Sequence, residues 1–110
     1  MKFKIKDNTA LVFENKSPEI DFFKTFENIY PKIQFNNIIV YLSGFQILDS
    51  NFIEKILKIS ESHHEGKRSF VIVSPIAIPD KFPDALEWAP TLQEAKDLIE
   101  MDEMQRDLEF

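Results

Sequence analysis

The chain has 110 residues, of which 44% are hydrophobic and 29% charged, a formal net charge of −6, and no cysteine. This length and composition are typical of one globular domain with its own core, so we expect a single domain over residues 1–110. The lack of cysteine excludes a disulfide framework, a cysteine nucleophile and thiolate metal ligands, and the acidic charge argues against nucleic acid as a partner.

The first ten residues, MKFKIKDNTA, alternate charged and apolar side chains and do not resemble the apolar core of a signal peptide. No apolar run reaches the length of about 20 residues that a membrane-spanning helix needs. We therefore expect a soluble cytoplasmic protein with no membrane partner. A cysteine-free chain also suits a reducing compartment.

Two short strands are predicted at the start of the chain. Residues 2–6 alternate lysine with apolar side chains, which is the period-two pattern of a half-buried strand. Asp7 and Asn8 are turn residues, and residues 9–13 have the composition of a second strand. The two strands are expected to form a hairpin.

A helix, a strand and a second helix are predicted next. Ser17 as N-cap and Pro18 at the first helical position begin the first helix, and Pro31 is expected to end it. Residues 38–42 form a continuous apolar run, typical of a central strand covered on both faces. Apolar residues at helical spacing then predict a helix that stops at Gly66, a favourable C-cap.

The rest of the chain predicts two strands and a helix. Residues 70–73 are a second buried strand, and residues 85–89 indicate a short edge strand. Thr91 begins a capping box that starts the last helix, on which Asp102 and Glu103 are expected to face solvent. The apolar stripe of this helix comprises Leu92, Ala95, Leu98 and Ile99, extended by Met101, Met104 and Leu108.

This order of elements predicts an α/β fold. We expect a mixed sheet of four or five strands with helices packed against it. Because a helix connects residues 38–42 to residues 70–73, these two runs should be adjacent parallel strands.

The residue pattern contains no recognisable catalytic or metal-binding motif. Gly44 and Gly66 are the only glycines and are too far apart for a phosphate-binding loop. His63 and His64 should point to different sides of a helix end, where they complement the helix dipole better than they would share a metal. Both also lie roughly 20 Å from Ser50 along the helix, at about 1.5 Å per residue. We expect no enzyme, no catalytic residue, no metal and no cofactor.

Three polar residues, Asp49, Ser50 and Asn51, lie between an apolar strand and an apolar helix. Any of them can serve as an N-cap by accepting a hydrogen bond from a backbone N–H group. An exposed Ser50 at a helix start could also carry a phosphate, because a helix N-terminus favours negative charge. The sequence leaves both interpretations open.

The run IIVYLSGFQILDSNFIEKILKI resembles the central segment of STAS domains, the family of anti-sigma factor antagonists and of the cytoplasmic ends of sulfate transporters. The shared pattern is a hydrophobic strand that reaches Leu42-Ser43, a loop, and then an Asp49-Ser50 step into a helix. The order of the other elements agrees with the family over residues 9–100.

The resemblance implies a non-enzymatic regulatory domain that binds a protein of the anti-sigma factor or kinase type. It also implies that Ser50 is the phosphoacceptor. The residues expected to support this site are Asp49, Asn51, Ser43 and Gly44. Phe45 and Phe52 flank it, and they are predicted to dock the partner if they are exposed or to belong to the core if they are not.

Two other functions fit the same sequence. One is a small-ligand-binding domain that holds an apolar or anionic molecule, which a cavity of about 300 Å³ or more beside Ser50 would favour. The other is a structural accessory subunit that associates through Met101, Met104 and Leu108. For the chain itself we expect a monomer or a weak homodimer.

Overall fold

The computed structural model of the chain describes residues 1–14, 19–42, 50–74 and 83–108, with the backbone alone for residues 19–21. None of the helices in these ranges is long and apolar enough to cross a membrane. The elements in chain order are β1 (Lys2–Lys6), β2 (Thr9–Glu14), α1 (Glu19–Ile33), β3 (Asn37–Leu42), α2 (Ser50–Glu65), β4 (Phe70–Val73), β5 (Glu87–Ala89) and α3 (Leu92–Leu108).

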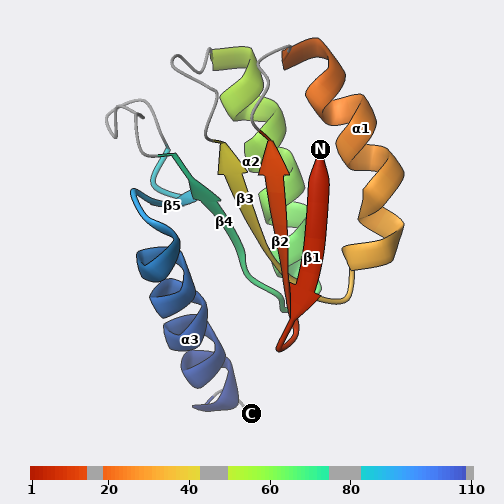
Figure 1. Cartoon of the computed structure of the whole chain (residues 1–110). Helices are drawn as coiled ribbons and strands as arrows, with labels where there is room; N and C mark the ends of the chain where they lie inside the picture. The colour runs from red at the N-terminus through yellow and green to blue at the C-terminus, as the bar shows by residue number, and fades with distance from the viewer. Residues whose placement is uncertain (15–18, 43–49, 75–82, 109–110) are drawn as a thin grey trace.

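The strands form a five-stranded mixed sheet in the order β1-β2-β3-β4-β5 (Figure 1). Strand β1 is antiparallel to β2, and the other neighbours are parallel. The β1–β2 hairpin turns through Asp7 and Asn8, whose φ angles of 51° and 65° suit the tight turn of a two-residue hairpin. The predicted α/β fold is confirmed, and so is the parallel pairing of β3 with β4, in which Val40 lies opposite Ile72.

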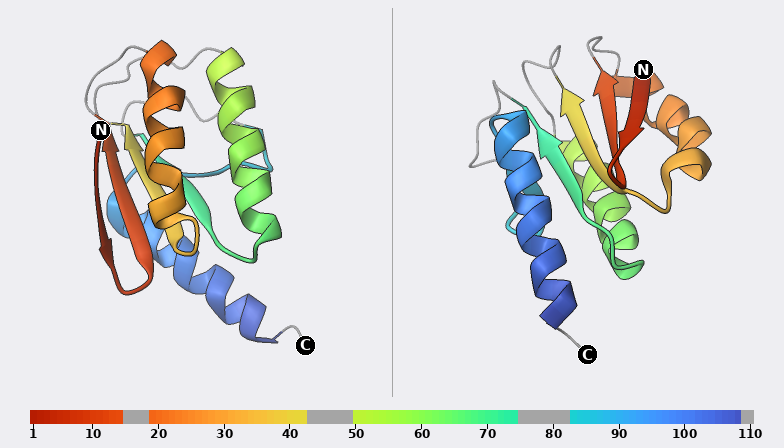
Figure 2. Two further views of the ribbon diagram at one scale, coloured as in Figure 1. Left: turned by 90° about the vertical axis from the view of Figure 1, so that its right-hand side faces the viewer. Right: turned by 60° about the horizontal axis from the view of Figure 1, so that its bottom comes forward.

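Helices α1 and α2 cover one face of the sheet, and α3 lies against the other (Figure 2). On the first face Phe22, Phe26 and Phe52 belong to a core that includes Ala10, Val12, Ile38, Val40, Phe70 and Ile72. On the second face, Ala95 and Ile99 of α3 belong to a smaller core with Ile39, Val71, Val73 and Ala89. Because β3 and β4 are covered on both faces, their sequences are apolar almost throughout.

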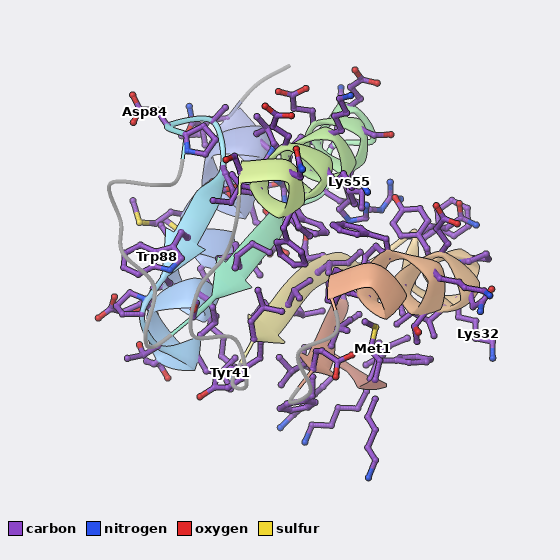
Figure 3. The ribbon with its side chains drawn as sticks, turned by 90° about the horizontal axis from the view of Figure 1, so that it is seen from above. Met1, Lys32, Tyr41, Lys55, Asp84 and Trp88 are labelled. Atoms are coloured by element: carbon purple, nitrogen blue, oxygen red, sulfur yellow. The ribbon has the colours of Figure 1, made fainter. Side chains whose placement is uncertain are left out.

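The α3 face is only partly covered. Leu11 and Tyr41 are half-buried at the border of the α3 core, and Phe13 beyond them is 39% exposed. Tyr41 points away from α1 and α2 (Figure 3). One helix on this face therefore leaves the part of the sheet next to β1 accessible to solvent.

The end of α1 differs from the prediction, because Pro31 lies inside the helix, which continues to Ile33. Proline removes one backbone donor from the last turns. The extension brings Ile33, whose side chain is fully buried, into the core. The free energy of burying an isoleucine side chain, about 1.5–3 kcal/mol, is comparable to the cost of about 3 kcal/mol that a proline imposes inside a helix.

The end of α2 also differs in detail. The helix ends at Glu65 as predicted, but the residue in the left-handed conformation is Lys67, with φ 61°, and not Gly66. The N–H groups of Gly66 and Lys67 donate to the carbonyls of His63 and His64 at 3.2 and 2.8 Å. These two bonds satisfy carbonyls of the last turn without a glycine in the left-handed position.

Candidate functional site

Strands β2, β3 and β4 end side by side, and the side of the sheet formed by their carboxyl ends is called the carboxyl edge. Glu14 lies opposite Leu42, and Tyr41 lies opposite Val73. Helices α1 and α2 begin at the same edge (Figure 1). In open α/β sheets, sites form outside the carboxyl ends of parallel strands, so this edge is the favoured location.

Ser50 is the first residue of α2, and both Ser50 and Asn51 are exposed. The first turn of the helix carries no acidic side chain. A helix N-terminus presents unpaired N–H groups and the positive end of the helix dipole. The hydroxyl of Ser50 therefore lies on a rigid element, at a position where added negative charge is favourable.

Phe52 belongs to the core, the second of the two roles that the sequence left open for it. Its side chain is 3% exposed, and its ring centroid lies 5.1 Å from the ring centroids of Phe22 and of Phe23 on α1. Two residues along a helix correspond to a rotation of about 200°. An outward-facing Ser50 therefore places Phe52 inside, where it joins α2 to α1.

Four of the predicted site residues lie outside the described residues, namely Ser43, Gly44, Phe45 and Asp49. The structure thus places two of the predicted polar residues, Ser50 and Asn51, at the surface of the edge. Lys55, one turn further along α2, lies with its ammonium group 5.4 Å from the ring centroid of Phe23 (Figure 3).

An aromatic pair on the α3 face was not expected as part of this edge. The ring centroids of Phe13 and Tyr41, near the ends of β2 and β3, are 6.2 Å apart. In the β1–β2 register Phe13 lies opposite Lys2, on the face that carries the lysines of β1. Side chains alternate between the two faces of a hairpin. Pairing the predicted strands would therefore have placed Phe13 on the face of the exposed lysines.

A polar cluster occupies the opposite edge, where β3 and β4 begin. The Ser69 hydroxyl donates to Asp102 at 2.9 Å, and the Asn37 amide donates to the Glu103 carboxylate at 2.6 Å. The Ser69 backbone N–H donates to Asn37 Oδ1 at 2.9 Å, and Arg106 donates to the Ser69 hydroxyl at 3.1 Å. Asp102 and Glu103 are thus not on a solvated face, which corrects the sequence interpretation. They hold α3 against the sheet.

The Asp102 carboxyl has a pKa raised above its usual value, first by burial and then by the neighbouring Glu87 carboxyl. The Ser69 hydroxyl and the Arg106 guanidinium oppose this shift. Burial and the nearby carboxyl of Glu87 both favour the protonated form of Asp102. Its position between α3, β4 and β5 makes it a structural contact in the fold.

The two histidines diverge, as their adjacency predicts. His63 is buried and contacts Tyr30 and the carbonyl of Asn36. The Nε2 atom of His64 accepts a hydrogen bond from the Phe70 backbone N–H at 3.2 Å. Each ring therefore contacts groups outside its own helix end, unlike the expected role at the helix dipole. In the described ranges no group of three His, Cys, Asp or Glu residues is arranged to hold a metal.

Comparison with known proteins supports the fold. The NMR structure of the protein TM1081 matches with a TM-score of 0.66 and 22% sequence identity, covering 89% of this chain and 86% of that chain. At this identity, the likeness shows a shared fold and nothing about activity. No family model matches the chain, and no curated protein sequence matches it either.

Proposed function

We propose that this chain is a non-enzymatic, cytoplasmic regulatory domain that binds a partner protein at the carboxyl edge of its sheet and is switched by phosphorylation of Ser50. One observation carries the proposal: Ser50 is exposed on the first turn of α2, while Phe52, Ile53 and Ile56 on the same helix are buried. The acceptor hydroxyl is therefore accessible on an element that the core holds in place.

The electrostatics of the first turn suit a phosphate. Phosphorylation adds about −1.5 to −2 charges at neutral pH, and a negative charge at a helix N-terminus gains about 0.3–1 kcal/mol when exposed. The first turn of α2 has no acidic side chain, and the acids nearest to Ser50 in the sequence are Asp49 before it and Glu54 one turn later. The fold would persist while the charge of the docking edge changes, which is the property that a switch needs.

The resemblance to STAS domains supports the same conclusion. The segment that carries it begins in β3, which ends at Leu42, and continues into α2, which begins at Ser50. The proposed partner is a protein of the anti-sigma factor or kinase type. Its kinase activity would transfer the terminal phosphoryl group of ATP to Ser50 Oγ, as the bond to ADP breaks and the hydroxyl proton passes to the kinase.

Affinity capture from the native cells, followed by intact-mass measurement of the recovered protein, tests this proposal. We expect wild-type protein to carry a phosphate and Ser50→Ala to carry none. The Ser50→Ala variant should lose about 1 kcal/mol in unfolding free energy, because the capping hydroxyl is absent. Ser50→Asp should fold and capture the partners of the phosphorylated form, since an acid at this position is tolerated.

Ser62→Ala is the matched control, because Ser62 is also exposed on α2 but lies at the other end of the helix. It should leave both phosphorylation and partner capture unchanged. The proposal is wrong if Ser50→Ala still gains a phosphate. It is equally wrong if Ser50→Ala and Ser50→Asp capture the same partners in the same amounts.

A further inference from the structure

A groove of about 530 Å³ lies on the partly covered face of the sheet, between the β1–β2 hairpin and α3. Leu11, Phe13 and Ile39 contribute apolar lining from the sheet, and Leu92 and Ile99 contribute it from α3. This groove is on the opposite face from α1 and α2, and Ser50 does not line it. A groove of this size, lined by both apolar and charged side chains, is a candidate binding surface.

The β1 side of the groove is basic. Lys4 and Lys6 line it, and Lys2 lies on the same face of the hairpin, opposite Phe13. All three lysines are exposed. The α3 side has mixed charge, with Lys96 beside Glu100 and Glu103, and Asp7 lies at the hairpin turn. An occupant that is apolar on one side and acidic toward β1 would therefore be complementary to the groove.

The outward face of α3 has this chemistry. Met101, Met104 and Leu108 are 64%, 66% and 77% exposed, and their spacing of three and four residues places them in one stripe. Asp97 continues the stripe one turn earlier, and Asp107 lies beside it; both are exposed.

The basic side chains of α3 do not neutralise this stripe. Lys96 lines the groove, and Arg106 donates hydrogen bonds toward Ser69 and Asn37 at the sheet. The stripe is therefore apolar with acidic borders, opposite in charge to the lysine row of β1.

We propose that this groove receives the Met101–Met104–Leu108 stripe of a second copy of the chain, so that two copies form a reciprocal homodimer. A two-fold dimer pairs the groove of each copy with the stripe of the other, so both surfaces become covered. Contacts between like surfaces are unfavourable, because stripe against stripe brings acids together and hairpin against hairpin brings lysines together. This association is separate from the switch at Ser50.

Charge reversal with rescue tests the dimer. We expect the mass of wild type in sedimentation or light scattering to rise toward that of two chains as concentration approaches about 1 mM. The groove variant Lys4→Glu/Lys6→Glu and the stripe variant Asp97→Lys/Asp107→Lys should each dimerise at least tenfold more weakly. An equimolar mixture of the two variants should regain wild-type association, because both interfaces of the mixed dimer are again complementary.

Lys24→Glu/Lys58→Glu is the control for the groove variant, because it changes the net charge by the same amount. Both of these lysines are exposed, and they lie on the helices that cover the other face of the sheet. It should dimerise as wild type does. A wild type that stays monomeric throughout the concentration range overturns the proposal. So does a mixture of groove and stripe variants that remains as weak as its components, which would leave the groove to a different occupant. Ser50→Ala should not alter the dimer, so failure here leaves the proposed switch intact.

Discussion

His63 is held by two hydrogen bonds that together define its protonation state. Its Nε2 atom lies 2.7 Å from the carbonyl oxygen of Asn36, which can only accept, so Nε2 carries the proton. Its Nδ1 atom lies 2.7 Å from the hydroxyl of Tyr30 and accepts from it when the ring is neutral. Burial lowers the pKa of His63 and raises the pKa of Tyr30, which favours this arrangement.

Substitution of His63 should therefore reduce stability in a pH-dependent way. His63→Ala leaves the Asn36 carbonyl and the Tyr30 hydroxyl without their partner, so we expect a loss of about 1–3 kcal/mol in unfolding free energy near neutral pH. The ordinary histidine pKa of 6.5 applies to the unfolded chain, and the folded value is lower. Wild-type stability should fall as pH drops below 6.5, because the unfolded chain takes up the proton first.

Denaturant unfolding at about pH 7.5 and about pH 5.5 measures both effects. The variant should lose less stability than wild type between these two pH values, because the buried histidine is gone. Equal losses for the two proteins would show that His63 does not cause the change in stability between these two pH values.

Asp102 should have the opposite pH dependence. Below the ordinary value of 3.8 its carboxyl is protonated in both the folded and the unfolded chain. As pH rises, the unfolded chain loses the proton first, so Asp102 contributes stability that is lost as pH rises through the raised folded pKa. Asp102→Asn lacks this loss and keeps an acceptor for Ser69.

The change in unfolding free energy caused by Asp102→Asn should therefore be more favourable at about pH 7 than at about pH 3.5. Thermal or denaturant unfolding at the two pH values provides the measurement. A variant that loses more stability at neutral pH would mean that Arg106 and Ser69 outweigh the burial of the charge.

For single residues, the sequence predicted the position correctly where that position depends on near neighbours in the chain. Ser50 was expected at the start of a helix and is found exposed there. The role of Phe52 was left open and the solvent-facing position of Asp102 was wrong, because the environments of both residues are set by distant segments. Phe22 and Phe23 of α1 enclose Phe52, and Asp102 bonds to Ser69, 33 residues away.

Among the elements, the strands and α3 were recognised from patterns that coincide with their packing. The run at β4 is buried throughout, and Thr91 caps α3, with its hydroxyl accepting from the Glu94 N–H at 3.2 Å. The ends of α1 and α2 were predicted less accurately. Pro31 was expected to end α1 but lies inside it, and Gly66 was expected to cap α2, whereas Lys67 has the left-handed conformation.

The relative importance of burial and capping leads to a prediction about stability. Ile72 is 1% exposed in the central pair of strands, so Ile72→Ala should cost about 2–5 kcal/mol by leaving a cavity. Thr91→Ala should cost only about 0.5–2 kcal/mol, through one capping bond. Equilibrium unfolding of the two variants at the same pH ranks them, and the opposite order would contradict the assigned core.

For the whole molecule, the alternation of strands and helices was sufficient to predict the α/β class and the β3–β4 pairing. The division of helices between the two faces could not be predicted, because each helix has one apolar stripe whichever face it covers. The groove beside α3 follows from that division. At the candidate site, the sequence predicted that Ser50 lies at the start of a helix and left open whether Phe52 faces the core.

The lysine row of β1 has a further consequence for aggregation. Among the described strands, β1 and β5 end the sheet, and a terminal strand offers unpaired backbone groups to which another chain can add. Strand β5 is only three residues long, which gives an incoming strand little to pair with. Strand β1 places a charge at every second position, Lys2, Lys4 and Lys6, so chains that stacked edge to edge through β1 would bring these ammonium groups together. Lys4 and Lys6, which line the groove, thus also oppose growth of the sheet into fibrils.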